Sequence, residues 1–297
     1  MDHRDFIARL PRRTLVALSA RRDAPGLAHL AGHLGLIAVM GAWIVAGGPA
    51  WWVLLVPQGI ALCFLFTLQH EATHKTPFAT EWLNEAVGHA AGAVIFQPFT
   101  WFRYFHLAHH RHTNDPERDP ELLAGAKPET RRAFAVHVSG LPYWLAMARR
   151  ILVNALGRHP GDFVPGRARG RVRAEARWML AFYAMAGASL VVSSLLVWVW
   201  LLPLLLGQPF LRLYLLAEHG RCAHLANMFD NTRTTFTNRI VRFLAWNMPY
   251  HVEHHVLPQV PFHKLPQLHA RMAGHHRVTA EGYGAFTADY VAHLTRP

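Results

Sequence analysis

The sequence contains little lysine, little acid and little cysteine. Only three of its 30 basic residues are lysine, and 18 acidic residues leave a formal net charge of +12. The charged fraction of 16% lies well below the roughly 25% of a typical soluble chain, which excludes a disordered or solubilising protein. The two cysteines, Cys63 and Cys222, exclude a disulfide framework and a cysteine-ligated zinc or iron–sulfur site. They favour a reducing, cytoplasm-facing chemistry.

Hydrophobic residues make up 52% of the chain and are concentrated in long runs. Crossing ~30 Å of hydrocarbon takes about 20 apolar residues. We therefore expect four membrane spans, at about residues 27–47, 51–69, 178–202 and 203–217. The Gly47–Pro49 break and Pro203 leave room only for tight turns, so the spans should form two hairpins. We expect one all-α membrane domain over residues 1–297, in which residues 70–177 and 218–297 form a helical cap.

The arginines indicate how the chain is oriented. Four of them, Arg12, Arg13, Arg21 and Arg22, precede the first span, and eight more lie between residues 149 and 177. Short loops rich in arginine and lysine stay in the cytoplasm. We therefore expect both termini and the whole cap to be cytoplasmic, in a multi-pass protein of a bacterial inner membrane. The positive charge is then mainly a topology signal, and we expect no nucleic-acid partner.

Eight of the 22 histidines fall into three clusters at the cytoplasmic ends of these spans. The clusters are His70 and His74 in QHEATH, His106, His109 and His110 in HLAHH, and His251, His254 and His255 in HVEHH. Residues spaced i, i+3 and i+4 share one side of a helix, so the imidazoles of each cluster can reach a common point. Imidazole binds iron, copper, nickel or zinc, whereas magnesium and calcium need carboxylate-rich sites. Eight imidazoles exceed what one metal uses, which predicts two metals.

The three clusters carry a resemblance to a known family. HEATH, FHLAHHRHTNDPERDPE and NMPYHVEHHVLPQVPFHKLP resemble the three histidine boxes of the membrane fatty acid desaturase superfamily, which includes lipid desaturases, hydroxylases and carotenoid ketolases. The resemblance covers roughly residues 68–265. It implies two non-haem irons, O₂ as co-substrate, and an all-helical, mostly four-span fold whose cytoplasmic cap holds the metals.

The resemblance also implies residues around the metals. A further histidine commonly completes the metal shell in that superfamily, and here His219 is preferred to His224 because it directly follows the fourth span. Asn247 is expected to hold a metal-bound water, as a family asparagine at a similar place does.

A ligating imidazole usually donates its other N–H to a carboxylate or carbonyl. The scarce acids gather near the boxes, and we expect such acceptors among Glu71, Asp115, Asp119, Glu218 and Glu253. Ordinary solvated loop acids remain the alternative for Asp115 and Asp119.

The predicted function is an O₂-dependent di-iron membrane oxidoreductase, most simply a desaturase that introduces a C=C bond into a fatty acyl or other lipid-like chain. A hydroxylase or ketolase acting on a lipid, carotenoid or small amphiphile stays open, because the boxes do not distinguish these outcomes. We assign no catalytic residue apart from the metal ligands. The aromatic residues before the second box either line a substrate channel from the bilayer or anchor the chain at the interface. They are Trp101, Phe102, Tyr104 and Phe105.

Two other classes of protein share parts of this pattern. HEATH fits the HExxH helix of a zinc metalloprotease, but that interpretation leaves the other two clusters unexplained. A histidine-rich metal transporter would need ligands within several spans, and the mid-span regions are nearly free of them.

The source of electrons is also constrained. The tripeptide His159-Pro160-Gly161 resembles the haem-ligand motif of a cytochrome b5 domain, but such a domain would need many tens of residues of its own. We therefore expect a separate electron donor, a ferredoxin or similar protein with its reductase.

Overall fold

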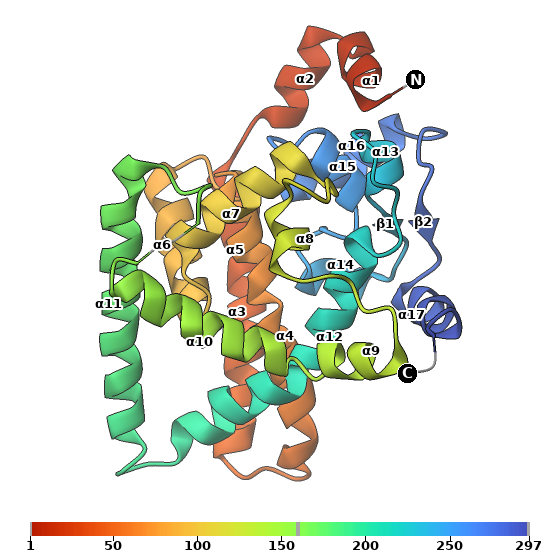
Figure 1. Cartoon of the computed structure of the whole chain (residues 1–297). Helices are drawn as coiled ribbons and strands as arrows, with labels where there is room; N and C mark the ends of the chain where they lie inside the picture. Colours follow the sequence, from red (N-terminus) through yellow and green to blue (C-terminus); the bar gives the residue numbers. More distant parts are fainter. Residues whose placement is uncertain (1, 159–160, 296–297) are drawn as a thin grey trace.

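The computed structural model describes residues 2–158 and 161–295, so His159 and Pro160 of the haem-like tripeptide lie outside the described residues. Long helices stand side by side, and shorter helices gather at one end of them (Figure 1). The helices are α1 (His3–Arg9), α2 (Arg12–Ser19), α3 (Asp23–Val45), η1 (Trp51–Leu54), α4 (Leu55–Cys63), α5 (Leu65–Thr73), α6 (Glu81–Val94), α7 (Phe99–His112), α8 (Pro120–Ala124), α9 (Arg131–Val138), α10 (Leu141–Ala155), α11 (Gly166–Ser189), η2 (Val197–Leu201), α12 (Leu202–His219), α13 (Met228–Asn231), α14 (Arg239–Leu244), α15 (His251–Val256), η3 (Phe262–Lys264), α16 (Leu265–Arg271) and α17 (Tyr283–Ala292). Within the described residues, strand structure is limited to β1 (Thr234–Thr235), which pairs in parallel with β2 (Thr279–Ala280), and one isolated bridge. The expected all-helical class is confirmed.

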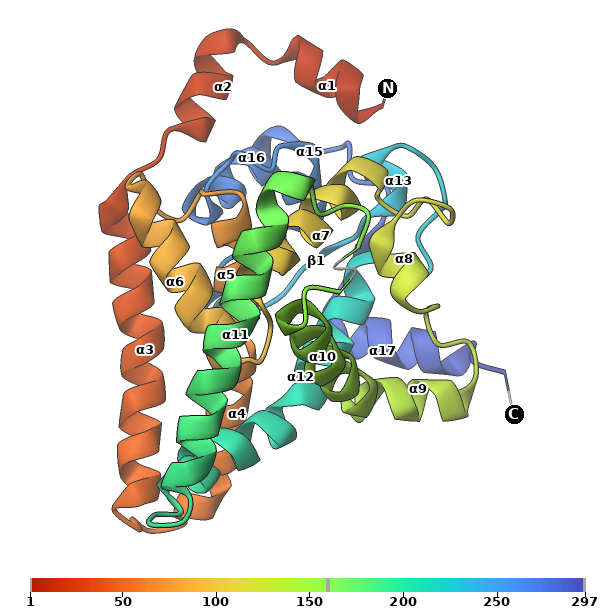
Figure 2. The ribbon, with the colours of Figure 1, turned by 60° about the vertical axis from the view of Figure 1, so that its left-hand side comes forward.

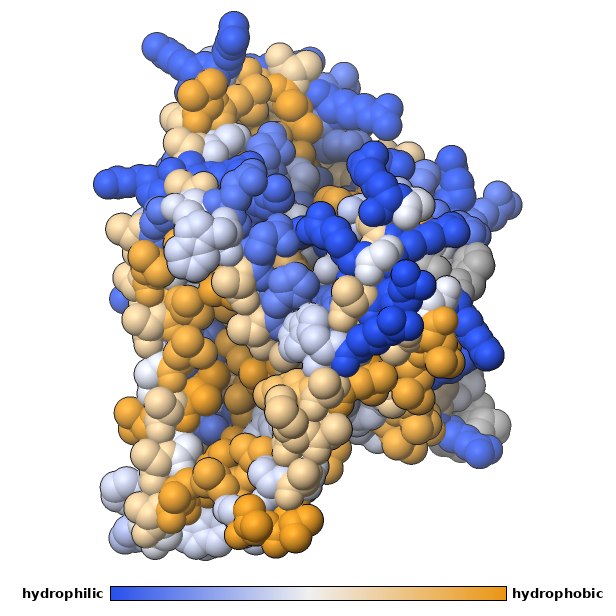
Figure 3. Space-filling model, turned by 90° about the vertical axis from the view of Figure 1, so that its left-hand side faces the viewer, coloured by the Kyte–Doolittle hydropathy of each residue, from blue (hydrophilic) through white to orange (hydrophobic). Residues whose placement is uncertain are grey.

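Three helical stretches of the described chain are long and apolar enough to cross a membrane: Arg12–Val45, Trp51–Thr73 and Val197–His219. The first two are joined by a tight turn in which Gly47 has a φ of +62°, a left-handed conformation that glycine adopts without strain. Viewed from the side of α11, hydrophobic residues cover the lower part of the molecule and hydrophilic residues gather above them (Figure 3). Figure 2 shows α3 and α11 running through the height of that lower part.

The expected corner at Pro203 is not where the chain turns. Helix α11 ends at Ser189, residues 190–196 form the turn, and one helical stretch runs from Val197 through Pro203 to His219. Proline normally interrupts a helix because its missing N–H leaves the carbonyl four residues earlier without a donor. Here that carbonyl, on Val199, accepts a hydrogen bond of 3.1 Å from Nε2 of Gln58 in α4. A side chain from another helix therefore replaces the missing donor.

Helices α4 and α12 cross with their backbones in contact. A Cβ added to Gly59 would lie 1.9 Å from the carbonyl oxygen of Pro203, and one added to Gly207 would lie 2.1 Å from the carbonyl carbon of Gly59. Only glycine fits at such a crossing. The contact fixes α12 against the helix that continues into α5, which brings the C-terminal ends of α5 and α12 together.

The start of α7 is fixed by an acid from a distant helix. The carboxylate of Glu175, on α11, accepts the backbone N–H groups of Phe99 and Thr100, each at 2.8 Å. These are among the N–H groups that have no partner inside the helix, so a carboxylate there both caps the helix and complements its dipole. This contact ties α7 to α11 near the predicted cytoplasmic end of the molecule.

Candidate metal centre

Four helices deliver nine histidines to one buried region. Helix α5 contributes His70, with His74 as its C-terminal cap, and α12 contributes its last residue, His219. The remaining six come from α7 and α15, at the same end of the molecule (Figures 1 and 2): His106, His109, His110, His251, His254 and His255. The helical spacing of each cluster therefore does bring its imidazoles to a shared place.

Five of these imidazoles form one group. Ring nitrogens of His70, His74, His106, His110 and His254 all lie within 4.8 Å of one another. Nε2 of His74 is 2.8 Å from Nε2 of His106, and Nε2 of His110 is 3.2 Å from Nε2 of His254. We call these five residues the five-histidine group.

The other four imidazoles form a second group beside the first. Nitrogens of His109, His219 and His255 lie within 4.8 Å of one another. His251 joins them, because its Nε2 is 3.1 Å from Nε2 of His219 and 3.1 Å from Nε2 of His255. Nε2 of His109 is 3.2 Å from Nε2 of His219. We call these four residues the four-histidine group.

The protonation state of these rings suits metal binding. Burial, reinforced by the neighbouring imidazoles, holds the pKa of five of them well below the usual value for histidine: His106, His110, His251, His254 and His255. Each of these rings is therefore neutral near pH 7 and keeps one nitrogen lone pair. Lone pairs that converge from several neutral imidazoles fit a cation such as iron or zinc, which imidazole ligates well.

In the four-histidine group, two of the Nδ1 atoms that point away from the group have hydrogen-bond acceptors. Nδ1 of His109 lies 3.0 Å from both carboxylate oxygens of Asp119, and Nδ1 of His219 lies 3.0 Å from the carbonyl oxygen of Asn231. Such contacts fix the tautomer in which Nδ1 donates and Nε2 is free to bind a metal. Burial opposes protonation of His109, but Glu121 and Asp119 outweigh it and raise its pKa.

Two further carboxylates face Nδ1 atoms of the site histidines, at distances slightly longer than those of Asp119 and Asn231. Oε1 of Glu218 lies 3.4 Å from Nδ1 of His251, and Oε1 of Glu71 lies 3.6 Å from Nδ1 of His254. The other oxygen of Glu71 accepts the Thr76 hydroxyl at 2.9 Å. Three of the five acids singled out from the sequence therefore lie beside the imidazoles.

The other two acids lie elsewhere. Asp115 forms an ion pair of 2.7 Å with Arg118, close to the surface. Glu253 accepts the Thr234 hydroxyl at 2.6 Å and contacts Nε2 of His276 at 2.7 Å as well as Nδ1 of His269. Glu253 therefore anchors α15 from behind rather than facing the two groups.

The structure also separates the two rival histidines and places Asn247. His219 belongs to the four-histidine group, whereas Nδ1 of His224 lies 2.9 Å from the Asn114 carbonyl oxygen. The side-chain amide of Asn247 donates to the Phe262 carbonyl at 3.1 Å, so its N–H₂ group is directed at the segment after α15.

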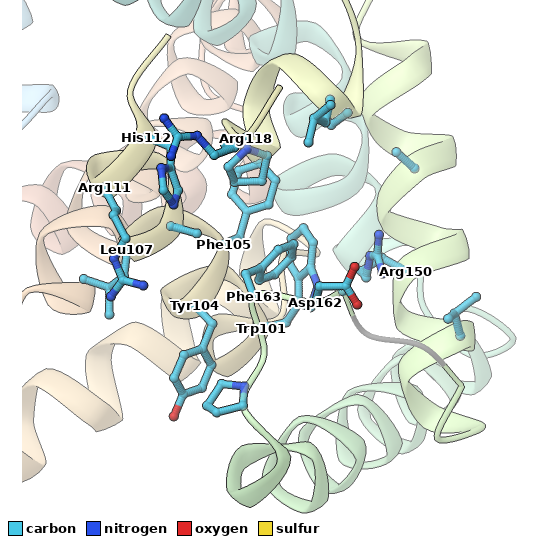
Figure 4. A pocket seen from close by; sticks show the side chains of 18 of the residues that line it. Trp101, Tyr104, Phe105, Leu107, Arg111, His112, Arg118, Arg150, Asp162 and Phe163 are labelled. Atoms are coloured by element: carbon cyan, nitrogen blue, oxygen red, sulfur yellow. The ribbon is translucent and has the colours of Figure 1, made fainter. Parts of the chain in front are cut away.

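The four aromatic residues before the second box do not share one face of α7. Phe102 points toward the metal site, with its ring centroid 5.5 Å from that of His106. Trp101, Tyr104 and Phe105 instead line a cavity of about 1190 Å³ on the outer side of the helix (Figure 4).

Sequence reasoning missed three groups at the site. The Thr113 hydroxyl lies 3.3 Å from Nδ1 of His255, and Oε2 of Glu121 lies 3.7 Å from Nδ1 of His109. Thr113 follows His109 by four residues, so helical spacing could have found it. The Asn231 acceptor could not have been found, because a backbone carbonyl leaves no residue signature.

The chain has long apolar helices that could cross a membrane, and nine imidazoles converge at one end of them. This combination defines a class of membrane protein in which histidines form a metal site. Within that class the assignment is specific. Residues 49–281 match the fatty acid desaturase family, and the chain belongs to this family. It is a membrane oxidoreductase, an enzyme of the desaturase family.

Curated relatives extend over most of the chain at low identity. The chain is 25% identical over 264 residues to an sn-1 oleoyl-lipid 12-desaturase of Picosynechococcus sp., covering 80% of this chain and 74% of the relative. It is 26% identical over 267 residues to the dihydrorhizobitoxine desaturase of Bradyrhizobium elkanii, covering 80% of this chain and 73% of that relative. The two relatives are named for different substrates.

Proposed function

We propose that this protein is an O₂-dependent, non-haem di-iron desaturase that introduces a C=C bond into a fatty acyl or other lipid-like chain. The observation that carries the proposal is the division of nine buried imidazoles into a group of five and a group of four. Two adjacent groups of converging imidazole nitrogens suit two metals. Membership of the desaturase family favours iron over the other metals that imidazole binds.

In this proposal the five-histidine group holds one iron and the four-histidine group holds the other. When bound, iron together with O₂ supplies the oxidising power that removes hydrogen from an unactivated C–H bond, which side chains alone cannot do. The protein orients the ligands through Asp119, the Asn231 carbonyl and Thr113. Burial of both groups excludes water, and no general base is required.

The contacts of Glu71 argue against a zinc protease built on HEATH. That mechanism needs the glutamate as a general base acting on a metal-bound water. Here one carboxylate oxygen accepts the Thr76 hydroxyl and the Phe262 N–H, at 2.9 and 3.1 Å, and the other is turned toward Nδ1 of His254. The carboxylate therefore holds the site together from outside the ring of Nε2 atoms.

We further propose that a single domain crosses the membrane four times, as two hairpins. The spans are α3, the η1–α5 stretch, the C-terminal half of α11 and the η2–α12 stretch, and the turns at 46–50 and 190–196 lie on the far side. The N-terminal half of α11 carries five arginines, which keeps that end, and with it the metal site, in the cytoplasm. The substrate then arrives from the bilayer, and electrons arrive from a separate donor such as a ferredoxin with its reductase.

The test compares cells that express the wild-type protein with cells that express His109→Ala, by mass spectrometry of membrane lipids and metabolites. The control is His293→Ala, at an exposed position after α17. A species lighter by two mass units in the wild type and the control, and absent with His109→Ala, supports desaturation. A gain of sixteen units instead identifies a hydroxylase. If neither shift occurs with iron, O₂ and reductant supplied, or if one zinc per chain is found without iron, the proposal is wrong.

A further inference from the structure

A cavity of about 1190 Å³ lies against α7 (Figure 4). Tyr104, Ala108 and Arg111 line it, and these positions lie about half a helical turn away from the face that carries His106 and His110. The cavity is therefore separated from the metals by the body of the helix. A substrate in this cavity could not reach the metals, so substrate oxidation does not explain why the cavity is there.

Positive charge dominates the lining of this cavity. Six arginines contribute to it, from α7, α10, α11 and the segments between helices: Arg111, Arg118, Arg149, Arg150, Arg158 and Arg167. Only two acids accompany them, Glu117 and Asp162. Arginines outnumber acids in the lining, so like charges repel one another across the cavity. An anion in the cavity would relieve that repulsion.

The remaining walls are apolar. Leu107, Met147, Val153 and Phe163 line the cavity together with the aromatic residues of α7. A hydrophilic anion alone would leave these side chains in contact with water. An anion attached to a hydrocarbon chain satisfies both parts of the lining.

The position of α10 places the cavity at the membrane surface. This helix lies across the direction of α3 and α11 in both ribbon views (Figures 1 and 2). Four leucines on one of its faces, Leu141, Leu145, Leu152 and Leu156, are 57, 62, 53 and 64% exposed. Of the α10 residues that line the cavity, Ala146, Met147, Arg150 and Val153 lie on another side, and Arg149 borders the leucine face. An amphipathic helix of this kind rests in the membrane interface, with its apolar face among the acyl chains and its basic side at the headgroups.

We propose that this cavity binds the phosphate-bearing headgroup of an anionic membrane phospholipid, whose acyl chains run along the leucine face of α10. Clusters of arginine on an interfacial helix recognise anionic lipids, with about 1 kcal/mol from each arginine near the surface. Because α7 forms one wall, the bound headgroup also supports the helix that carries three of the metal-site histidines. The proposal does not depend on which reaction the metals catalyse.

The test uses the purified full-length protein, stripped of lipid and then incubated with vesicles of phosphatidylcholine or of phosphatidylglycerol. Retained lipid is counted by native mass spectrometry. The double variant Arg111→Gln/Arg149→Gln removes two charges from the cavity. The control, Arg131→Gln/Arg132→Gln, removes the same charge from exposed positions on α9. Circular dichroism and metal content check that both variants keep the native fold.

We expect the wild type and the control to retain phosphatidylglycerol in preference to phosphatidylcholine, and the cavity variant to bind phosphatidylglycerol about thirtyfold more weakly. Inorganic phosphate at the same concentration should not displace the lipid, because it lacks the apolar part. Equal loss in both double variants, equal retention of the two lipids, or displacement by phosphate alone would each overturn the proposal. So would a cavity variant that retains lipid normally but loses binding of an acidic electron-transfer protein, which would make the cavity a protein-docking site.

Discussion

Replacing Asp119 by asparagine tests how the four-histidine group is held. The Asp119 carboxylate is buried, with 1% of its surface exposed, and lies 3.0 Å from Nδ1 of His109 through both oxygens. It also accepts the backbone N–H groups of Asn114 and Glu121, at 2.7 and 2.9 Å. Asparagine has the same shape but only one acceptor oxygen and no charge. One of these three donors must then face an N–H₂ group instead of an acceptor.

The size of the effect follows from the role of His109. Loss of an outer partner of a ligating imidazole typically weakens metal binding ten- to hundredfold, which is about 1.4 to 2.7 kcal/mol. We expect that loss at the four-histidine group, while the five-histidine group, which lacks His109, keeps its metal. A donor left facing a donor should also lower the free energy of unfolding by about 1 to 3 kcal/mol.

The assay is iron content per chain after equilibration with increasing concentrations of a chelator. The wild type should lose both irons together over a narrow range. Asp119→Asn should lose one iron at about ten- to hundredfold lower chelator concentration. The matched control is Asp115→Asn, because Asp115 pairs with Arg118 near the surface. If Asp119→Asn retains both irons as firmly as Asp115→Asn, the reasoning about His109 is refuted.

Two further predictions concern the crossing of α4 and α12. Gly59→Ala would force a methyl group against the Pro203 backbone, so thermal unfolding should show the free energy of unfolding lowered by roughly 3 kcal/mol or more. The control is Gly187→Ala, where no atom lies within 4 Å of the added Cβ, and it should be neutral or slightly stabilising. Equal melting temperatures for the two variants would contradict the close contact. Gln58→Leu should lower the free energy of unfolding by about 1 to 3 kcal/mol, because the Val199 carbonyl loses the side-chain donor that Gln58 supplies in a water-poor region. If the variant and the wild type unfold at the same midpoint in one detergent, the helix continues through Pro203 without that hydrogen bond.

Proline illustrates where sequence reasoning about this chain failed. Pro203 predicted a corner, since a proline inside an apolar run usually ends or bends a helix. The structure turns instead at residues 190–196 and continues the helix through the proline. The compensating donor, Gln58, lies more than 140 residues earlier in the chain. A local rule cannot anticipate a hydrogen bond that exists only once two distant helices pack together.

The histidines illustrate the converse. Their types and spacings were sufficient to predict that each cluster converges, because helix geometry relates residues within a few positions of each other. The sequence did not predict which histidine of a cluster belongs to which of the two groups. His109 and His110 are neighbours in the chain but point about 100° apart around α7, so they enter different groups. Which imidazole meets which depends on how α5, α12 and α15 are placed around that helix.

By itself the sequence determined the apolar segments, the helical class and the nitrogen donors, because hydrophobicity and helical periodicity are properties of neighbouring residues. Only the tertiary structure decided that nine imidazoles divide into five and four, and that Asp119 and the Asn231 carbonyl orient two of them. It also placed the cationic cavity and the two histidine groups on opposite sides of α7. The five-histidine group joins residues as far apart in the chain as His70 and His254, and such contacts form only when helices pack against one another.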